Sequence, residues 1–142
     1  MKIAIASDHG GYELKEALKR HFAAYDFADL GTNSNEPVDY PDYGAALARR
    51  VAAGEFGRGI LICGSGIGIS IAANKIKGIR AALCHNAYTA EMSRRHNDAN
   101  ILAMGGRVVD VKTAVEMTEI FLQTEFEGGR HAARVAKISA LE

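Results

Sequence analysis

A glycine-rich turn that begins with a thiol is the most distinctive chemical feature of the sequence. The turn Cys63–Gly68 (CGSGIG) follows an apolar run and precedes a stretch of helical character. Glycines let the backbone bend tightly and present N–H groups to an anion, and the dipole of the following helix adds partial positive charge. A thiol beside a helix start ionises more readily, so Cys63 suits a general base or a nucleophile. The same residue could equally be a small apolar strand residue.

Two nucleotide-binding motifs are excluded around this turn. A dinucleotide fingerprint needs a third glycine, where this chain has Ile69, and an acidic residue about 20 residues further on. The segment 83–85 (LCH) has no such acid. A P-loop needs Gly-Lys-Ser/Thr, which is also missing here. We therefore interpret the turn as an anion-binding site with the candidate contacts Gly64, Gly66, Ile67 and Gly68.

Histidines near expected strand ends are candidates for proton transfer. Asp8 and His9 follow the first apolar run. A carboxylate beside an imidazole suits acid–base work, although Asp8 could equally cap a helix that starts near Gly11. His96 precedes another apolar run and could exchange a proton at neutral pH, but taken alone it is better explained as an exposed loop residue. Two further histidines receive no role, the solvated His21 and the ambiguous His85.

A basic cluster opens the last helical stretch. Arg130 and Arg134 are four residues apart, so their guanidinium groups share one helix face and could grip a phosphate between them. His131 points about 100° away from Arg130, and Arg107 could join the pair. The alternative is a solvated basic face paired with glutamates of the preceding loop, and the pattern alone favours it slightly.

Composition excludes several classes of protein and of site. The 17 Lys and Arg residues balance the 17 Asp and Glu residues, which argues against nucleic-acid or membrane partners. No apolar stretch is long enough to span a bilayer, and the first residues, which turn polar at Ser7 and Asp8, are not expected to act as a signal peptide. The chain has no His-Glu-x-x-His and no Cys-x-x-Cys, so we expect neither a metal nor a cofactor. Its two cysteines, Cys63 and Cys84, indicate reduced thiols and a cytoplasmic location.

Alternating strand and helix patterns must position these residues. The expected strands are Lys2–Ala6, Phe27–Leu30, Gly59–Cys63, Ile79–Cys84 and Ile101–Met104. The expected helices are Tyr12–Ala24, Asp42–Ala53, Gly66–Asn74, Ala87–Arg95, Val111–Gln123 and Arg130–Leu141. This alternation predicts an α/β fold, a three-layer α/β/α Rossmann-like single domain over residues 1–142 with a five-stranded parallel sheet. Ligands bind beyond the carboxyl ends of such strands, where most of the candidate residues fall.

Several motifs, taken in order, carry a resemblance to a known family. They are IASDHGG, DYPDYG, GILICGSGIGISIAANKIKGIRAA, SRRHNDANILAMGGR and FEGGRHAARV. Together they resemble the B-type ribose-5-phosphate isomerases, whose family also holds galactose-6-phosphate and allose-6-phosphate isomerases. The resemblance covers essentially the whole chain. It implies an aldose–ketose isomerase that interconverts D-ribose 5-phosphate and D-ribulose 5-phosphate through a cis-enediolate, in the non-oxidative pentose phosphate pathway.

The resemblance also implies roles for individual residues. Cys63 matches the base that moves the proton between C2 and C1, and Ser65 matches an assisting hydroxyl that is commonly threonine in the family. His96 matches the acid that opens the sugar ring, with Asp8 in support. Matches to phosphate-site positions are His9, Arg107, Arg130, His131 and Arg134. Matches to other substrate-contacting positions are Tyr43 and Asn97.

An assembly is implied as well, namely a homodimer, sometimes paired into a dimer of dimers, with active sites at the subunit interface. Some phosphate-site residues would then come from the partner subunit. Two other enzyme readings stay open: an isomerase of allose 6-phosphate, and one of galactose 6-phosphate, which fits less well because that enzyme needs two different subunits. A non-catalytic phosphosugar-binding module is a further alternative. A redox role for Cys63 lacks a nearby resolving cysteine.

Overall fold

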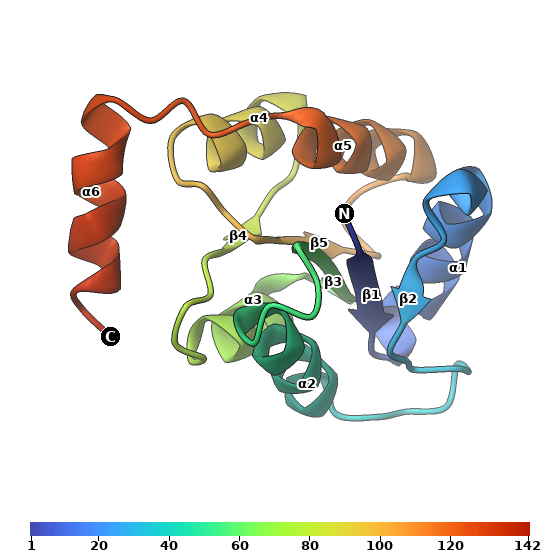
Figure 1. Ribbon diagram of the computed structural model, residues 1–142. Helices are drawn as coiled ribbons and strands as arrows, with labels where there is room; N and C mark the ends of the chain where they lie inside the picture. Colours follow the sequence, from blue (N-terminus) through green and yellow to red (C-terminus); the bar gives the residue numbers. More distant parts are fainter.

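A parallel sheet forms the centre of the molecule, and the computed structural model describes all residues from 1 to 142 (Figure 1). Its strands are β1 (Ile3–Ser7), β2 (Ala28–Asp29), β3 (Arg58–Cys63), β4 (Ala81–Leu83) and β5 (Ile101–Gly105). They lie in the order β2-β1-β3-β5-β4, and every neighbouring pair is parallel. The predicted five-stranded parallel sheet is confirmed.

Helices cover both faces of this sheet, which confirms the predicted three layers. The helices are α1 (Tyr12–His21), α2 (Tyr40–Ala52), α3 (Ile67–Asn74), α4 (Ala87–Arg95), α5 (Val111–Gln123) and α6 (Arg130–Ser139), with short 3-10 turns at His9–Gly11 and Ala23–Tyr25. Successive strand residues point to opposite faces. Ile60 and Ile62 of β3 pack with α1, α4 and α5, whereas Leu61 and Cys63 pack with α2 and α3.

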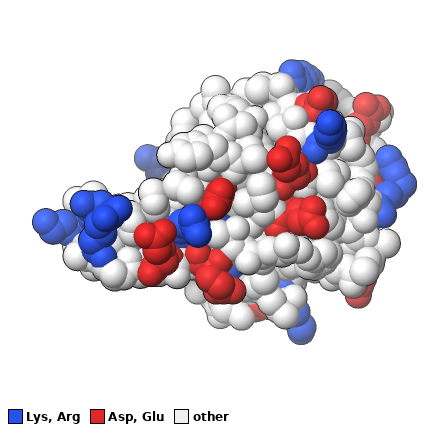
Figure 2. All heavy atoms as spheres, turned by 90° about the horizontal axis from the view of Figure 1, so that it is seen from above, with Lys and Arg blue, Asp and Glu red and all other residues white.

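Helix α6 stands apart from both layers, beyond the β4 edge of the sheet (Figure 1). His131 is its only buried residue. The apolar side chains of Ile138 and, just past the helix, Leu141 are 43% and 86% exposed. The part that projects on the same side in Figure 2 carries a group of Lys and Arg side chains with acidic ones beside it. The last helix therefore offers both apolar and basic groups that the rest of this chain does not cover.

Several boundaries differ from the sequence-based expectation. β4 spans Ala81–Leu83, and at its start side chains take the place of strand neighbours: Asn100 accepts from the Arg80 N–H and Asn74 from the Ala81 N–H. Helix α2 begins at Tyr40, since a proline suits the first helical turn. Helix α1 ends at His21, three residues early. None of the helices combines the length and the apolar character needed to cross a membrane.

Candidate active site

Three loops at the carboxyl ends of β1, β3 and β5 meet through their backbones. The Asp8 N–H donates to Ile62 O (3.2 Å), and the Gly106 N–H donates to Cys63 O (2.8 Å). The loops approach so closely that a Cβ atom on Gly105 would lie 2.6 Å from the backbone of Ser65, and one on Gly10 would lie 2.9 Å from Gly64 N. Glycines at these contacts let the segments that follow the three strands form one surface.

The turn after β3 presents both a sulfur atom and free backbone donors. Gly66 caps α3 with φ of 79°, a left-handed conformation that favours glycine. Its N–H donates to Cys63 Sγ at 3.1 Å, and the Ile67 N–H donates to Ser65 Oγ at 3.2 Å. The N–H groups of Gly64, Ser65 and Gly68 donate to no acceptor within the chain. The turn can therefore offer three unpaired donors to an anion, whereas the N–H groups of Gly66 and Ile67 are already engaged.

Cys63 has the most covered side chain of the turn. Only 4% of the residue is exposed, and it packs in the core cluster beneath α2 and α3. Its neighbour Ser65 is exposed and Gly64 is half-buried. A small molecule would therefore reach the sulfur only from the side of the turn, at the carboxyl edge of the sheet.

Asp8 acts as a helix cap in this structure. Its Oδ1 accepts from the N–H groups of Gly10 (2.9 Å) and Gly11 (3.2 Å), and the residue is buried. The capping interpretation of Asp8 is therefore confirmed, while its supporting role in catalysis stays a prediction. The cap fixes the loop that carries His9, whose Nδ1 accepts from the Val38 N–H at 3.2 Å.

A polar cavity lies beside the glycine turn. Its volume is about 270 Å³, and its lining includes His9, Gly10, Glu13, Asn35 and Arg107. The guanidinium of Arg107 also lies over the turn, because a Cβ on Gly64 would come within 2.9 Å of its Nη1. The structure thus brings two of the predicted phosphate-site residues, one from β1 and one from β5, to the same cavity.

Two tyrosines of α2 pack against glycines near the carboxyl ends of the strands, one in a loop and one in the first turn of α3. The ring of Tyr43 lies on Gly31, where an added Cβ would be 2.7 Å from Cε1. The ring of Tyr40 lies against Gly68, where a Cβ atom would overlap it. Sequence reasoning singled out Tyr43 but missed Tyr40, since the DYPDYG motif gives no sign of which ring covers the turn.

A second group of predicted residues assembles around two histidines. The rings of His96 and His131 stack with centroids 4.2 Å apart and planes at 11°. His131 is 4% exposed, and its Nε2 has no hydrogen-bond partner. Burial lowers the pKa of His131, and the nearby His96 and Arg130 lower it further. Glu127, which sequence reasoning treated only as a partner for the arginines, lies 3.6 Å from His131.

The basic pair of α6 is free in this chain. Arg130 and Arg134 are both exposed, and neither forms an ion pair. Their exposure agrees with the alternative of a solvated basic face, whereas the expected pairing with loop glutamates is not formed. Two exposed guanidinium groups one turn apart remain available for an anion. Asn97, the other predicted contact near His96, is also exposed.

The two groups lie at opposite ends of the strands, one at the carboxyl ends and the other at the amino ends. Cys63 ends β3, whereas the loop after His96 meets its beginning, where the Gly59 N–H donates to Asn100 O at 3.0 Å. Strand residues rise by about 3.3 Å each, so the four steps from Gly59 to Cys63 separate these ends by about 13 Å. Within one chain, His96, His131 and the α6 arginines do not reach the thiol.

The histidine cluster also has the chemistry of a metal site. His96, Glu127 and His131 hold possible ligand atoms within 4.8 Å of one another, a grouping that sequence spacing did not predict. An imidazole lone pair lies in the plane of its ring. Nearly parallel stacked rings therefore hold their lone pairs in two nearly parallel planes that do not meet at a common point, and a shared ion would require one ring to turn.

Comparison with known proteins identifies the family. The family model described as Ribose/Galactose Isomerase matches residues 3–138, nearly the full chain. The chain belongs to this family. It is therefore an aldose–ketose isomerase, as the sequence resemblance implied.

Individual relatives agree along their whole length. Ribose-5-phosphate isomerase B of Escherichia coli is 48% identical over 143 residues, covering 99% of this chain and 96% of the relative. The solved Clostridium thermocellum ribose-5-phosphate isomerase B has a TM-score of 0.96 at 55% identity, covering 99% and 97% of the two chains. The Mycoplasma genitalium enzyme, solved with bound ribulose 5-phosphate, has a TM-score of 0.93 at 40% identity, covering 99% and 95%.

Proposed function

We propose that this chain is a metal-independent ribose-5-phosphate isomerase that interconverts D-ribose 5-phosphate and D-ribulose 5-phosphate, as the names of its relatives state for those proteins. The observation that carries the proposal is the turn after β3, where a sulfur atom lies beside unpaired backbone donors. Isomerisation at C1 and C2 needs one base and a means of stabilising a negatively charged oxygen. The turn supplies both from adjacent residues.

Cys63 is the base in this mechanism. Its thiolate takes the proton from C2 of the open-chain aldose, leaving a cis-enediolate, and returns the proton to C1 to give the ketose. The Gly66 N–H points at the sulfur, an arrangement suited to a sulfur that carries negative charge. The free N–H groups of Gly64 and Ser65 are the donors to the enediolate oxygens. Such donors are worth about 3–4 kcal/mol each in other enzymes.

His96 opens the sugar ring before this step. It protonates the ring oxygen while a base accepts the proton of the anomeric hydroxyl. Burial lowers the pKa of His131, which disfavours a positive charge on the ring that stacks on His96. The cap formed by Asp8 supports the opposite side of the site, where it fixes the loop of His9.

Basic residues hold the phosphate at the far end of the substrate. Arg107 and His9 line the cavity at the carboxyl edge, and Arg130 with Arg134 offers an unpaired face on α6. Binding of the phosphate away from the reacting carbons orients the sugar over the turn and helps to lower the barrier.

A homodimer completes this site. His96 and α6 lie at the edge opposite Cys63, so only a second copy can bring them to the sulfur. In a two-fold dimer each copy gives the same residues to the other, which forms two equivalent sites from one contact. The uncovered apolar residues Ile138 and Leu141 support such a contact. A pairing of dimers and a cytoplasmic location remain predictions.

We expect His96→Asn to lower kcat on ribose 5-phosphate by at least about 100-fold, the usual contribution of general acid–base catalysis. Because ring opening then limits the rate, the primary isotope effect with substrate deuterated at C2 should fall below its wild-type value. Steady-state assays with ordinary and with C2-deuterated ribose 5-phosphate measure kcat and the isotope effect. An isotope effect that stays at the wild-type value would contradict the ring-opening role.

We expect Arg134→Ala to raise KM about tenfold to hundredfold, the effect of losing a charged hydrogen bond, with a much smaller change in kcat. Phosphate binding is remote from the reacting carbons, so the variant loses affinity before it loses chemistry. Arg20→Ala, which removes another exposed arginine, is the control and should leave KM unchanged. An unchanged KM in Arg134→Ala would place the phosphate elsewhere.

One assay tests the proposed function as a whole. Chelator-treated protein is supplied with ribose 5-phosphate and allose 6-phosphate side by side, and formation of the ketose is measured. Turnover of the pentose supports the proposal, and preference for the hexose would favour the six-carbon alternative. Binding of both sugars without turnover would instead indicate a phosphosugar-binding module.

A further inference from the structure

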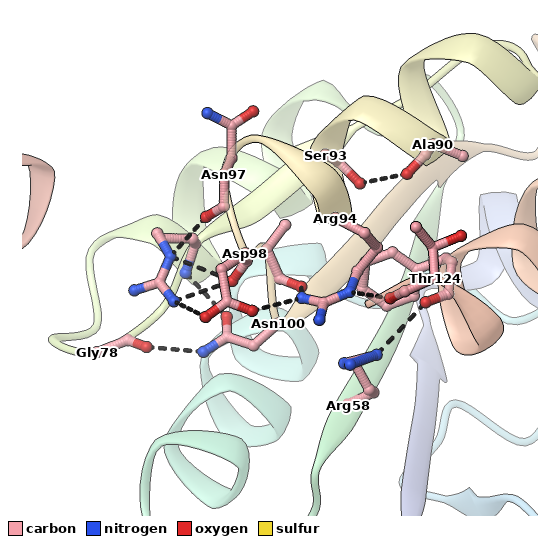
Figure 3. A network of polar contacts seen from close by, with 12 residues as sticks. Arg58, Gly78, Ala90, Ser93, Arg94, Asn97, Asp98, Asn100 and Thr124 are labelled. Carbon is pink, nitrogen blue, oxygen red and sulfur yellow. Dashed lines mark hydrogen bonds and ion pairs between the residues drawn. The ribbon is translucent and has the colours of Figure 1, made fainter. Parts of the chain in front are cut away.

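A buried arginine, Arg94, forms hydrogen bonds with the loop that follows His96. Arg94 is only 3% exposed, and its guanidinium and Nε donate to Asp98 Oδ1 (2.9 Å), Ala99 O (2.6 Å) and Thr124 O (3.1 Å) (Figure 3). Its guanidinium also lies 5.8 Å from the centre of the Phe121 ring. A charge is costly to bury unless it is fully paired, so this arginine is fixed in one geometry.

A second arginine holds the same loop from the other side. Arg80 Nε donates to Asn97 O at 2.9 Å, and Nη2 donates to Asp98 O at 2.9 Å. Its Nη2 also lies 3.5 Å from Asp98 Oδ2, so each carboxylate oxygen of Asp98 faces a different arginine (Figure 3). The backbone on both sides of Asp98 is therefore fastened by guanidinium groups.

The backbone that these two arginines hold has an unusual conformation at Asp98. Asp98 has φ of 46°, and it is one of two residues other than glycine with a positive φ. Such strain persists only where the surroundings enforce it, and it concentrates at functional sites. Here it turns the chain sharply, immediately after His96 and Asn97 and before β5.

Hydrogen bonds also connect the end of α4 to the segment that leads to His131. Arg94 holds Thr124 O, just past the end of α5, and the Glu127 N–H donates to Arg95 O at 3.1 Å. The linker between α5 and α6 is thus fastened to the end of α4 at two points. The stack of His96 on His131 joins the two segments that Arg94 ties together.

We propose that Arg94 and Arg80 are positioning residues that set the His96 imidazole for ring opening. The proposal rests on the proposed function in that His96 protonates the ring oxygen. Neither arginine needs to touch the substrate. Their planar, multiple-donor groups hold the loop at fixed angles, which a lysine ammonium cannot reproduce although it keeps the charge.

Arg80→Lys and Arg94→Lys test this role against the wild type and against Arg50→Lys, which alters an exposed arginine paired with Glu55. We expect both test variants to lower kcat on ribose 5-phosphate about 10-fold to 100-fold, because misplacement by 1 Å can cost that much. The primary isotope effect with C2-deuterated substrate should fall as in His96→Asn. Arg50→Lys should match the wild type in both.

A thermal melt of each variant separates positioning from unfolding. Arg94 is deeply buried, so its variant can lose stability. Arg80 is partly exposed, so its variant tests the same role with a smaller effect on folding. Loss of folded protein lowers kcat but leaves the isotope effect at its wild-type value. A wild-type kcat in both variants, or a lowered kcat with an unchanged isotope effect, would overturn the proposal.

A second readout needs no substrate. The Cε1–H resonance of His96, assigned by its loss in His96→Asn, should shift in Arg80→Lys and stay in place in Arg50→Lys. If the wild type fails to convert ribose 5-phosphate, the proposed function is wrong, and this resonance still decides whether the arginines set the ring. An unmoved resonance in Arg80→Lys would overturn the positioning role.

Discussion

Cys63→Ala should abolish interconversion of ribose 5-phosphate and ribulose 5-phosphate, with a fall in kcat of about 10⁴-fold, the upper range for loss of an acid–base group. The sulfur is the only side-chain atom of the glycine turn that accepts from the helix-capping N–H, and alanine leaves no group there to take the C2 proton. Exchange of that proton with solvent deuterium, followed by NMR, should stop as well. Exchange at the wild-type rate would remove Cys63 as the base.

Cys84→Ala is the matched control for this experiment. Cys84 is also buried, but it packs on the other face of the sheet with α4, and burial raises the pKa of its thiol. Its removal should cost a little stability and leave turnover intact. Equal losses in the two variants would show that the effect of Cys63→Ala comes from packing rather than from a missing base.

Mixing two inactive variants should restore activity if each site contains residues from both subunits. Cys63→Ala and His96→Asn chains, denatured and refolded together, would pair at random. Half of the dimers would then be mixed, each with one intact site, which gives about one quarter of wild-type activity by symmetry. Each variant refolded alone should remain nearly inactive, so the expected gain is large.

The control mixture joins Cys63→Ala with Ser65→Ala. Both residues belong to the same turn, so no arrangement of these two chains contains an intact site. If this mixture gains as much activity as the first, exchange of subunits is not the cause. If neither mixture exceeds the average of its components, Cys63 and His96 do not work together across an interface.

Local chemistry made much of the fold predictable. Helix α4 spans the expected Ala87–Arg95 because the side chains of Asn86 and Thr89 cap its start. Helix α5 begins as expected because Asp110 accepts from the Thr113 N–H. β4 could not be bounded from its apolar residues, since the limit is set by Asn74 and Asn100, which are distant in the sequence.

The candidate site residues could be named from the sequence, but most of their arrangement could not. Spacing and resemblance named Cys63, His96 and His131, yet nothing local shows that the two histidines stack. The separation of Cys63 from His96 does follow from the expected elements, because Cys63 ends one strand and His96 precedes another that runs parallel to it. Arg94 was not singled out, because its i,i+4 spacing from Asp98 is common on helices and its contact with Thr124 forms only in the folded chain.

The close backbone contact of Gly10, Gly64 and Gly105 has a consequence for how substrate preference can change in this family. Where main chains touch, no side chain is available for adjustment, so in the proposed site single substitutions at these glycines cannot reshape the surface expected beneath C1 and C2. Adaptation to a longer sugar is left to the other end of the ligand, at the exposed loop 33–39 and on α6. We therefore expect the residues around the reacting carbons to tolerate few substitutions, whereas the residues that determine which sugar length fits can vary.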